Sequence, residues 1–367
     1  MKKHTHKTWV EVSKDALENN VKVVRKLLSP NTKLLAVVKS NAYGHGLVDT
    51  AKLFLKYGAD WLGVDNIDEA ILLRKSKVKK SVLVLGSTPP HRFGDASKNN
   101  INLTLYNLEP GFARTNVPFH IKIDTGMSRQ GVLMPEVSNF FRNLPAGTNI
   151  EGVFTHFANA DDLHDRTYPN MQLANFHRIL DTIHKLGVRP RIRHAAATTG
   201  LLTMPESHFD MVRAGVMLYG LWPSKEFAKK FKELKTEPAL TWKTTVAQVK
   251  KIKKGTSLGY GITEQVKKDS KIAVLPTGYY DGYDRGLSSI GEVLIGGKRC
   301  KILGRVSMNL MVADVSKVKN VRTGSEVVLI GKQDKERITA EEMAEKINTI
   351  SYEIVARINP LLPRIYV

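Results

Sequence analysis

Eight short apolar runs of strand length recur through about the first 220 residues of the chain. They cover residues 34–39, 61–65, 82–86, 102–106, 119–124, 152–157, 191–196 and 211–220. Helical patterns lie between most of them, and alternating strand and helix signals predict parallel βα units. Eight such units match a closed (β/α)₈ barrel of the TIM type in number and length. A doubly wound open sheet is the alternative, but it usually carries a GxGxxG turn after its first strand, and none follows residue 39.

Two segments between these runs have clear helical spacing. In the first, apolar residues recur at i, i+4, i+7 and i+11, with Ser13 as a candidate N-cap and Pro30 just past the end. The apolar residues are Leu17, Val21, Val24 and Leu28. The second segment, before residue 191, carries Phe176, Ile179, Leu180 and Ile183. We predict a helix in each segment.

The pattern changes near Pro238, after which strand signals dominate. The predicted strands cover residues 241–252, 271–275, 291–295, 299–303, 310–315 and 325–331. Gly296 and Gly297 predict a hairpin turn between two of them, and Thr339 predicts the N-cap of one helix. We therefore predict a barrel domain over 11–235 and a mostly β domain over 236–367, to which a strand at 8–12 is a candidate addition.

Composition limits the classes of function. The net charge is +21, but the lysines are scattered and form no long basic arm, so no nucleic-acid partner is predicted. Cys300 is the one cysteine, which excludes a disulfide within the chain and fits a reducing compartment. No apolar run is long enough to span a membrane, and no signal-peptide core follows Met1. We expect a cytoplasmic protein with no membrane partner.

Polar side chains fall at or near the ends of several predicted barrel strands, where barrel enzymes have their active sites. They include Lys39, Lys122, His156, His194 and Arg213. The Lys39 amine follows a buried run, and partial desolvation there lowers the pKa of an amine and makes it a nucleophile for Schiff-base chemistry. Each of these residues alone could be structural. Their convergence at one barrel mouth is harder to explain by packing.

The last two predicted barrel strands add a possible phosphate site. Barrels often bind phosphate in the loops after these strands. Thr198 offers a hydroxyl there, and Gly215 offers backbone that a ligand can approach closely. A lysine amine that can react with an aldehyde, a phosphate site and an arginine together suggest pyridoxal 5′-phosphate (PLP) as cofactor. No metal site is predicted.

The sequence closely resembles the alanine racemase family of PLP enzymes over nearly its whole length. The matching segments are AVVKSNAYGHG, IKIDTGMSRQG, THFANAD, MVRAGVMLYG, LGYGITE, LPTGYYDGYDR and GRVSMNL. The resemblance implies a homodimeric isomerase that interconverts L- and D-alanine and supplies D-alanine for peptidoglycan. It also implies that Lys39 binds PLP covalently and acts as one base, while Tyr260, which reaches the partner chain's barrel, is the other.

The resemblance assigns further roles at matching positions. Arg213 faces the pyridine nitrogen and His194 supports it, while His156 hydrogen-bonds to Tyr260. The cofactor phosphate is bound by Tyr43, Thr198, Gly215 and Val216. Arg129 orients the cofactor's phenolate oxygen, and Met308 and Tyr279 of the partner line the substrate entrance and carboxylate site. Lys122 matches a position that is carbamylated in some members.

Three positions depart from the family pattern: Ala197, Asn309 and Pro360. Many members place a tyrosine near the position of Pro360, directed at the phosphate and the substrate, and proline has no hydroxyl. We expect weaker PLP binding or a pocket that admits larger amino acids. Restoring the hydroxyl with Pro360→Tyr should tighten PLP binding in a cofactor titration, and an unchanged affinity would contradict this expectation.

The resemblance leaves other activities open. A racemase of serine or lysine is the main alternative, since few residues tune the pocket. A PLP decarboxylase of the same fold type is less favoured, because those enzymes place an acidic residue where Arg213 stands and a cysteine near the substrate. A non-catalytic PLP carrier resembles the barrel alone and lacks the second domain that carries Tyr260.

Overall fold

The computed structural model describes residues 6–108 and 116–367. The chain divides into two compact units. One comprises Leu17–Ala42 and Leu47–Glu237, and we call it the barrel unit. The other comprises the described part of Met1–Ala16 together with Tyr43–Gly46 and Pro238–Val367, and we call it the β-rich unit.

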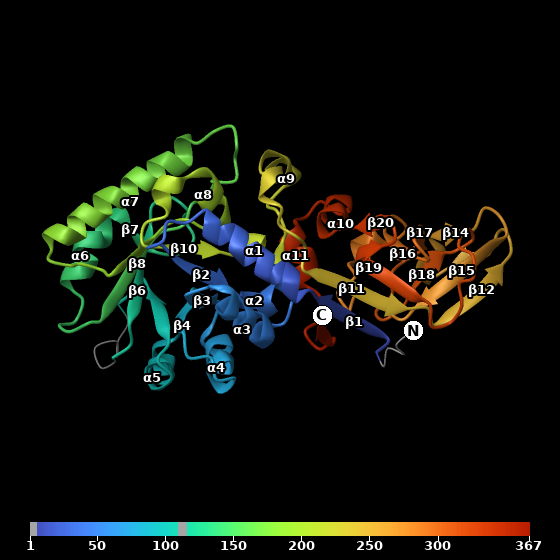
Figure 1. Cartoon of the computed structure of the whole chain (residues 1–367), viewed down its shortest axis with the longest axis horizontal. Helices are drawn as coiled ribbons and strands as arrows, with labels where there is room; N and C mark the ends of the chain where they lie inside the picture. The colour runs from blue at the N-terminus through green and yellow to red at the C-terminus, as the bar shows by residue number, and fades with distance from the viewer. Residues whose placement is uncertain (1–5, 109–115) are drawn as a thin grey trace. The chain divides into compact units, whose positions relative to one another are not determined.

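The barrel unit contains eight parallel strands that nearly close into a ring, and most of them are labelled in Figure 1. In chain order they are β2 (Lys33–Val37), β3 (Trp61–Val64), β4 (Ser81–Val84), β5 (Asn102–Leu105), β6 (Phe119–Asp124), β8 (Ile150–Phe154), β9 (Ile192–His194) and β10 (Met211–Ala214). Their order in the sheet is β10-β2-β3-β4-β5-β6-β8-β9, and the short β7 (Val132–Leu133) pairs with the end of β6. An isolated parallel bridge from Ala197 to Arg213 joins the two ends of this order. The predicted (β/α)₈ architecture is confirmed.

One helix precedes the first barrel strand, and others follow most of the strands. They are α1 (Lys14–Lys26), α3 (Leu47–Tyr57), α4 (Ile67–Lys75), α5 (Phe93–Lys98), α6 (Val137–Arg142), α7 (Thr167–Lys185), α8 (Thr198–Thr203) and α9 (Lys225–Lys230). Both predicted helices are present as α1 and α7. The Ser13 Oγ accepts the Ala16 N–H at 3.1 Å, as expected of an N-cap. On α7, Phe176, Ile179 and Ile183 are buried, which explains the apolar spacing.

Each of the eight predicted barrel runs contains a strand, but the last was predicted too long. The run 211–220 continues as a strand only to Ala214. Gly215 then leaves the β region with φ −122° and ψ −101°, and residues Val216–Tyr219 form a 3₁₀ turn, η5. The apolar character persists because these residues are also buried, so hydropathy alone gave no signal for the end of the strand.

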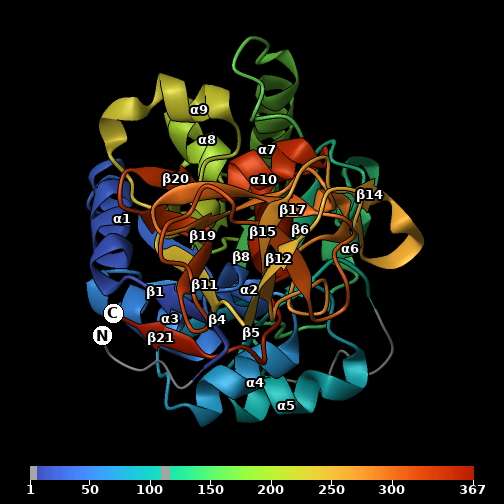
Figure 2. The same ribbon diagram turned by 90° about the vertical axis from the view of Figure 1, so that its right-hand side faces the viewer.

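Most strands of the β-rich unit are hydrogen-bonded into one large sheet, and many of them are labelled in Figure 2. Its strands are β1 (Thr8–Val12), β11 (Leu240–Thr245), β12 (Gln248–Ile252), β15 (Ser270–Leu275), β16 (Glu292–Ile295), β17 (Lys298–Leu303), β18 (Met311–Asp314), β19 (Glu326–Gln333), β20 (Glu336–Ile338) and β21 (Arg364–Tyr366). β13 (Ser257–Leu258) and β14 (Glu264–Gln265) form a separate pair. Two helices, α10 (Ala340–Lys346) and α11 (Ser351–Ala356), complete the unit. The candidate strand at the N-terminus, β1, pairs with β11 and β21.

Local signals in this unit predicted turns and caps well. Gly296 and Gly297 have φ of +58° and +69° and join β16 to β17, as the predicted hairpin requires. The Thr339 Oγ1 accepts the Glu342 N–H at 3.1 Å and caps α10. The predicted strand 241–252 is instead two strands, because β11 pairs with β19 while β12 pairs with β15. No helix within residues 6–108 and 116–367 is long and apolar enough to cross a membrane.

Candidate active site

Lys39 lies just beyond the end of β2, in a turn of unusual backbone conformation. The strand ends at Val37, two residues earlier than predicted. Ser40, Asn41 and Ala42 then all adopt left-handed helical angles, with φ between +51° and +55°. Each such residue costs about 1–2 kcal/mol, so the rest of the unit must hold the turn in place.

The Lys39 side chain has a more polar environment in the barrel unit than a buried strand end would give. It is 39% exposed, and its Nζ lies 3.4 Å from Oδ1 of Asp65. Asp65 directly follows β3, the neighbour of β2 in the sheet. The amine therefore stands at the C-terminal edge of the barrel, which is where barrel enzymes place reactive groups.

Arg213, on β10, is a buried cation held by neutral acceptors. Its guanidinium donates to Nδ1 of His194 at 2.7 Å, to Nδ1 of His156 at 3.1 Å, and to the carbonyls of Thr155 and Ala195, each at 2.8 Å. Burial lowers the pKa of Arg213 to about 9, so the group stays cationic at neutral pH. None of these four bonds goes to a carboxylate, so the positive charge remains available to a ligand.

The donor pattern of Arg213 fixes the tautomers of the two histidines. Because each Nδ1 accepts a hydrogen bond, the ring proton is assigned to Nε2 in both His156 and His194. Burial, followed by the charge of Arg213, holds the pKa of both imidazoles well below the usual range. Both rings are therefore neutral at pH 7, and His156 presents an Nε2–H donor.

His120, on β6, extends this network and was not predicted. Nε2 of His194 donates to Nδ1 of His120 at 2.9 Å, while the ring of His194 stacks on Phe154 with centroids 4.6 Å apart. Burial lowers the pKa of His120 to about 3. A signal was present in the sequence, since His120, Lys122 and Asp124 alternate with apolar residues and so share one face of the strand.

Lys122 is a buried lysine on the same face. Its side chain donates to Oε1 of Gln130 at 3.3 Å. Burial lowers its pKa to about 8, and the charges of Arg129 and Arg213 add to the effect. The exposed Arg129 thus lies within electrostatic range of Lys122, in a loop that Asp124 orders. The Asp124 Oδ1 accepts the backbone N–H groups of Gly126, Met127 and Ser128.

The predicted phosphate loops meet at the ends of β9 and β10. Thr198 begins α8 and is buried, and its Oγ1 accepts the N–H of Gly215 at 3.1 Å. Gly215 follows β10 directly, and Val216 begins the η5 turn. One hydroxyl and the backbone of two successive residues are therefore gathered at the same edge of the barrel as Arg213.

The remaining predicted residues belong to the β-rich unit. Tyr43 is half-buried there, its ring centroid is 6.1 Å from that of Tyr352, and desolvation raises its pKa to about 12. Tyr260 is 73% exposed and begins the η7 turn (Tyr260–Ile262). In that turn Gly261 has φ +75°, and a Cβ on it would lie 2.8 Å from Nη1 of Arg305.

Tyr260 belongs to an exposed apolar patch of the β-rich unit. The patch comprises Tyr260, Ile262, Tyr279, Tyr280, Met308 and Leu310. The N–H of Tyr279 donates to Ser307 O at 3.0 Å and that of Tyr280 to Met308 O at 2.9 Å, which joins two segments of the patch. Arg305 packs against the η7 turn and joins the third. Adjacent exposed apolar residues of this kind mark an interaction surface.

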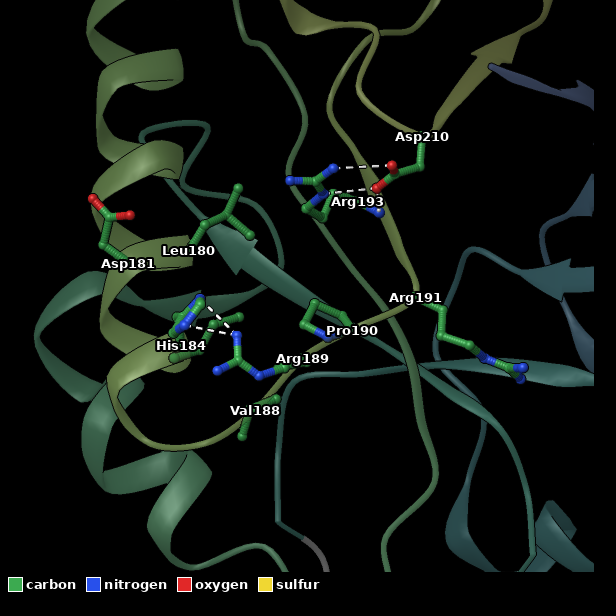
Figure 3. A pocket seen from close by; sticks show the side chains of 10 residues that line it. Leu180, Asp181, His184, Val188, Arg189, Pro190, Arg191, Arg193 and Asp210 are labelled. Atoms are coloured by element: carbon green, nitrogen blue, oxygen red, sulfur yellow. Dashed lines mark hydrogen bonds and ion pairs between the residues drawn. The ribbon is translucent and has the colours of Figure 1, made fainter. Parts of the chain in front are cut away.

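A pocket of about 300 Å³ lies at the opposite edge of the barrel strands (Figure 3). It is formed around the start of β9 and includes His184, Arg189, Arg193 and Asp210. Arg193 makes a two-point ion pair with Asp210, at 2.7 and 3.0 Å, and Arg189 donates to the His184 ring. None of the predicted site residues lines it.

Comparison with known proteins agrees with these observations. The family model "Alanine racemase, N-terminal domain" matches residues 12–223, and "Alanine racemase, C-terminal domain" matches residues 239–366. The chain is 39% identical to the alanine racemase of Methanococcus maripaludis, covering 99% of both chains. It is 41% identical to that of Symbiobacterium thermophilum, covering 98% of this chain and 97% of the relative.

Solved structures give the same answer. The crystal structure of alanine racemase from Bacillus anthracis with bound L-Ala-P has a TM-score of 0.93 and 37% identity, covering 99% of this chain and 96% of that one. The alanine racemase structure from E. faecalis has a TM-score of 0.89 and 32% identity, covering 99% and 98%. Both domain models and full-length relatives therefore agree, and the chain belongs to the alanine racemase family.

Proposed function

We propose that this chain is a PLP-dependent isomerase that interconverts L- and D-alanine, with Lys39 and Tyr260 as its two bases. The observation that carries the proposal is Arg213, a buried cation whose guanidinium bonds only neutral groups at the barrel edge that holds Lys39. When bound, PLP supplies an electron sink for the negative charge left when the α-proton is removed.

The residues proposed to bind this cofactor fit it in chemistry. The Lys39 amine suits the aldehyde, and the Thr198 hydroxyl with the backbone of Gly215 and Val216 suits the phosphate. Tyr43, shortly after Lys39 in the sequence, is proposed as a further phosphate contact, and Arg129 as the partner of the phenolate oxygen. His194 holds the Arg213 guanidinium through its Nδ1, at 2.7 Å.

Arg213 selects among the reactions that PLP can support. The cationic Arg213 guanidinium would disfavour a proton on a pyridine nitrogen bound beside it. A ring nitrogen kept unprotonated withdraws electrons less strongly. Proton return to the α-carbon is then favoured over slower side reactions, which suits a racemase.

His156 is proposed to tune the second base. Its Nε2–H is a donor because its Nδ1 accepts from Arg213. A donor to the phenolic oxygen of Tyr260 stabilises the phenolate, which makes proton removal by that oxygen easier. Lys39 and Tyr260 can then act on opposite faces of the same planar carbon, as inversion of configuration requires.

We further propose that the enzyme is a homodimer in which Tyr260 of the partner subunit completes the site. The exposed apolar patch supports this, because a second copy that covered it would remove Tyr260, Tyr279 and Met308 from water. Tyr279 and Met308 are proposed to line the substrate entrance. A cytoplasmic location is also proposed, consistent with the buried thiol of Cys300, and a role for D-alanine in peptidoglycan follows from the family.

The experiment that tests the activity is α-proton exchange in D₂O. The PLP-loaded enzyme is given L-alanine, L-serine and L-lysine in parallel, and the deuteration and chirality of the amino acid are followed. We expect deuterated D-alanine to form fastest. Faster inversion of serine or lysine would assign the enzyme to that substrate instead, and exchange without any D product would reject the second base.

A further inference from the structure

One carboxylate, on α4, holds the backbone on both sides of the Lys39–Asp65 ion pair. Oε1 of Glu69 accepts the N–H of Ser40 at 2.7 Å, and Oε2 accepts the N–H of Asp65 at 2.8 Å. Ser40 follows Lys39 directly, and Oδ1 of Asp65 is 3.4 Å from the Lys39 amine. Glu69 therefore links the turn that carries the lysine to the loop that carries its ionic partner.

The unfavourable backbone conformation of the turn requires stabilising contacts such as these hydrogen bonds. Ser40, Asn41 and Ala42 are in the left-handed region, where L-amino acids crowd their own backbone. Asn41 makes one local bond, since its Oδ1 accepts the N–H of Leu47 at 3.0 Å. The Glu69 carboxylate accepts from the first residue of the turn, and a charged acceptor makes a stronger bond than a neutral one.

Glu69 is itself well fixed. Its N–H donates to Oδ1 of Asn66, the N-cap residue of α4, at 3.0 Å. It also lies in the first turn of that helix, where a negative charge is favoured. A rigid helix thus places both carboxylate oxygens, so the two backbone bonds are made without further ordering of a long side chain.

We propose that Glu69 is a positioning residue for Lys39, acting through the N–H groups of Ser40 and Asp65. The inference rests on the proposed function, because Lys39 must be aimed at the cofactor and at the α-carbon for its position to matter. Small errors in the placement of a reacting group are costly, so releasing the turn should reduce turnover more than substrate binding.

Glu69→Gln tests this directly. Glutamine keeps the length of the side chain but has one acceptor oxygen, and its NH₂ group faces one of the two backbone N–H groups instead of accepting from it. In the PLP-loaded enzyme we expect kcat to fall about tenfold with KM for alanine within about twofold. We also expect the amides of Ser40 or Asp65 to exchange with deuterium about tenfold faster, measured on overlapping peptides by mass spectrometry.

Asp68→Asn is the matched control on the same helix turn. The Asp68 carboxylate contacts Arg92 at 2.9 Å and not the Lys39 turn, so both kcat and the two exchange rates should stay within about twofold of the original. If Glu69→Gln leaves exchange at Ser40 and Asp65 unchanged, the proposed hold is wrong. If exchange rises but kcat is unchanged, the positioning role is wrong.

The two proposals can fail separately. If the original enzyme does not invert alanine, the proposed function fails, while the exchange comparison still decides whether Glu69 holds the turn. Faster exchange in Glu69→Gln but not in Asp68→Asn would then support the proposed Glu69 contacts, and equal exchange in both variants would overturn them. A general loss of structure is recognised by faster exchange across the whole barrel unit, which would overturn the specific role.

Discussion

Replacing Lys39 by alanine is expected to abolish racemisation and to remove the visible absorbance of the lysine-bound cofactor. The substitution removes the amine that is proposed to react with the PLP aldehyde and that is also one of the two proposed bases. Loss of a general base alone typically costs about 10²–10⁴-fold in rate, and loss of the covalent attachment adds to it. Absorbance spectra and alanine inversion, measured at saturating PLP, check both effects.

A lysine on the same unit provides the control. Lys52 is exposed on α3, away from the Lys39 turn in sequence, and Lys52→Ala should leave spectrum and rate unchanged. Turnover retained by Lys39→Ala at more than about one hundredth of the original rate would reject Lys39 as one of the two bases. A lost spectrum with retained turnover would separate cofactor attachment from proton transfer.

Tyr260→Phe is expected to reduce racemisation by about 10²–10⁴-fold while PLP binding stays close to that of the original enzyme. The substitution removes the phenolic oxygen and keeps the ring. L- and D-alanine have equal free energy in water, so kcat/KM for inversion must fall equally in both directions. The α-proton of one enantiomer should still exchange, because Lys39 can remove and return it from its own face.

Proton exchange measured separately for L- and D-alanine in D₂O therefore distinguishes the second base from a merely structural tyrosine. Tyr280→Phe is a matched control, since it removes a hydroxyl from the same exposed patch, and it should leave inversion within about twofold. Equal loss of exchange for both enantiomers in Tyr260→Phe would contradict the two-base assignment.

The same two variants test whether the site is shared between subunits. A dimer that pairs a Lys39→Ala chain with a Tyr260→Phe chain has one site with both bases and one with neither. Co-expression of the two inactive chains should therefore restore up to about a quarter of the original activity, because about half of the dimers are mixed. No recovery in purified mixed dimers would mean that Tyr260 serves the barrel of its own chain.

The sequence alone determined the architecture and many local features. Continuous apolar runs of strand length indicated all eight barrel strands, and apolar spacing of period 3.6 indicated helices α1 and α7, because both patterns depend on which residues are buried. Caps and turns depend on a few adjacent residues, and Ser13, Thr339 and the Gly296-Gly297 pair fulfil the expected roles. The ends of the predicted apolar runs also indicated that Lys39, Thr198 and Arg213 lie at or near the ends of barrel strands.

Only the tertiary structure decided how these residues meet. Arg213 contacts His194 and His156, which are 19 and 57 residues away from it in the sequence. His120 contacts His194, which is 74 residues away. The contact of Glu69 with Ser40 spans 29 residues, and the left-handed turn beside Lys39 has no glycine to signal it. Such contacts are set by sheet register and barrel closure, which bring distant strand ends together, and a local pattern carries no information about either.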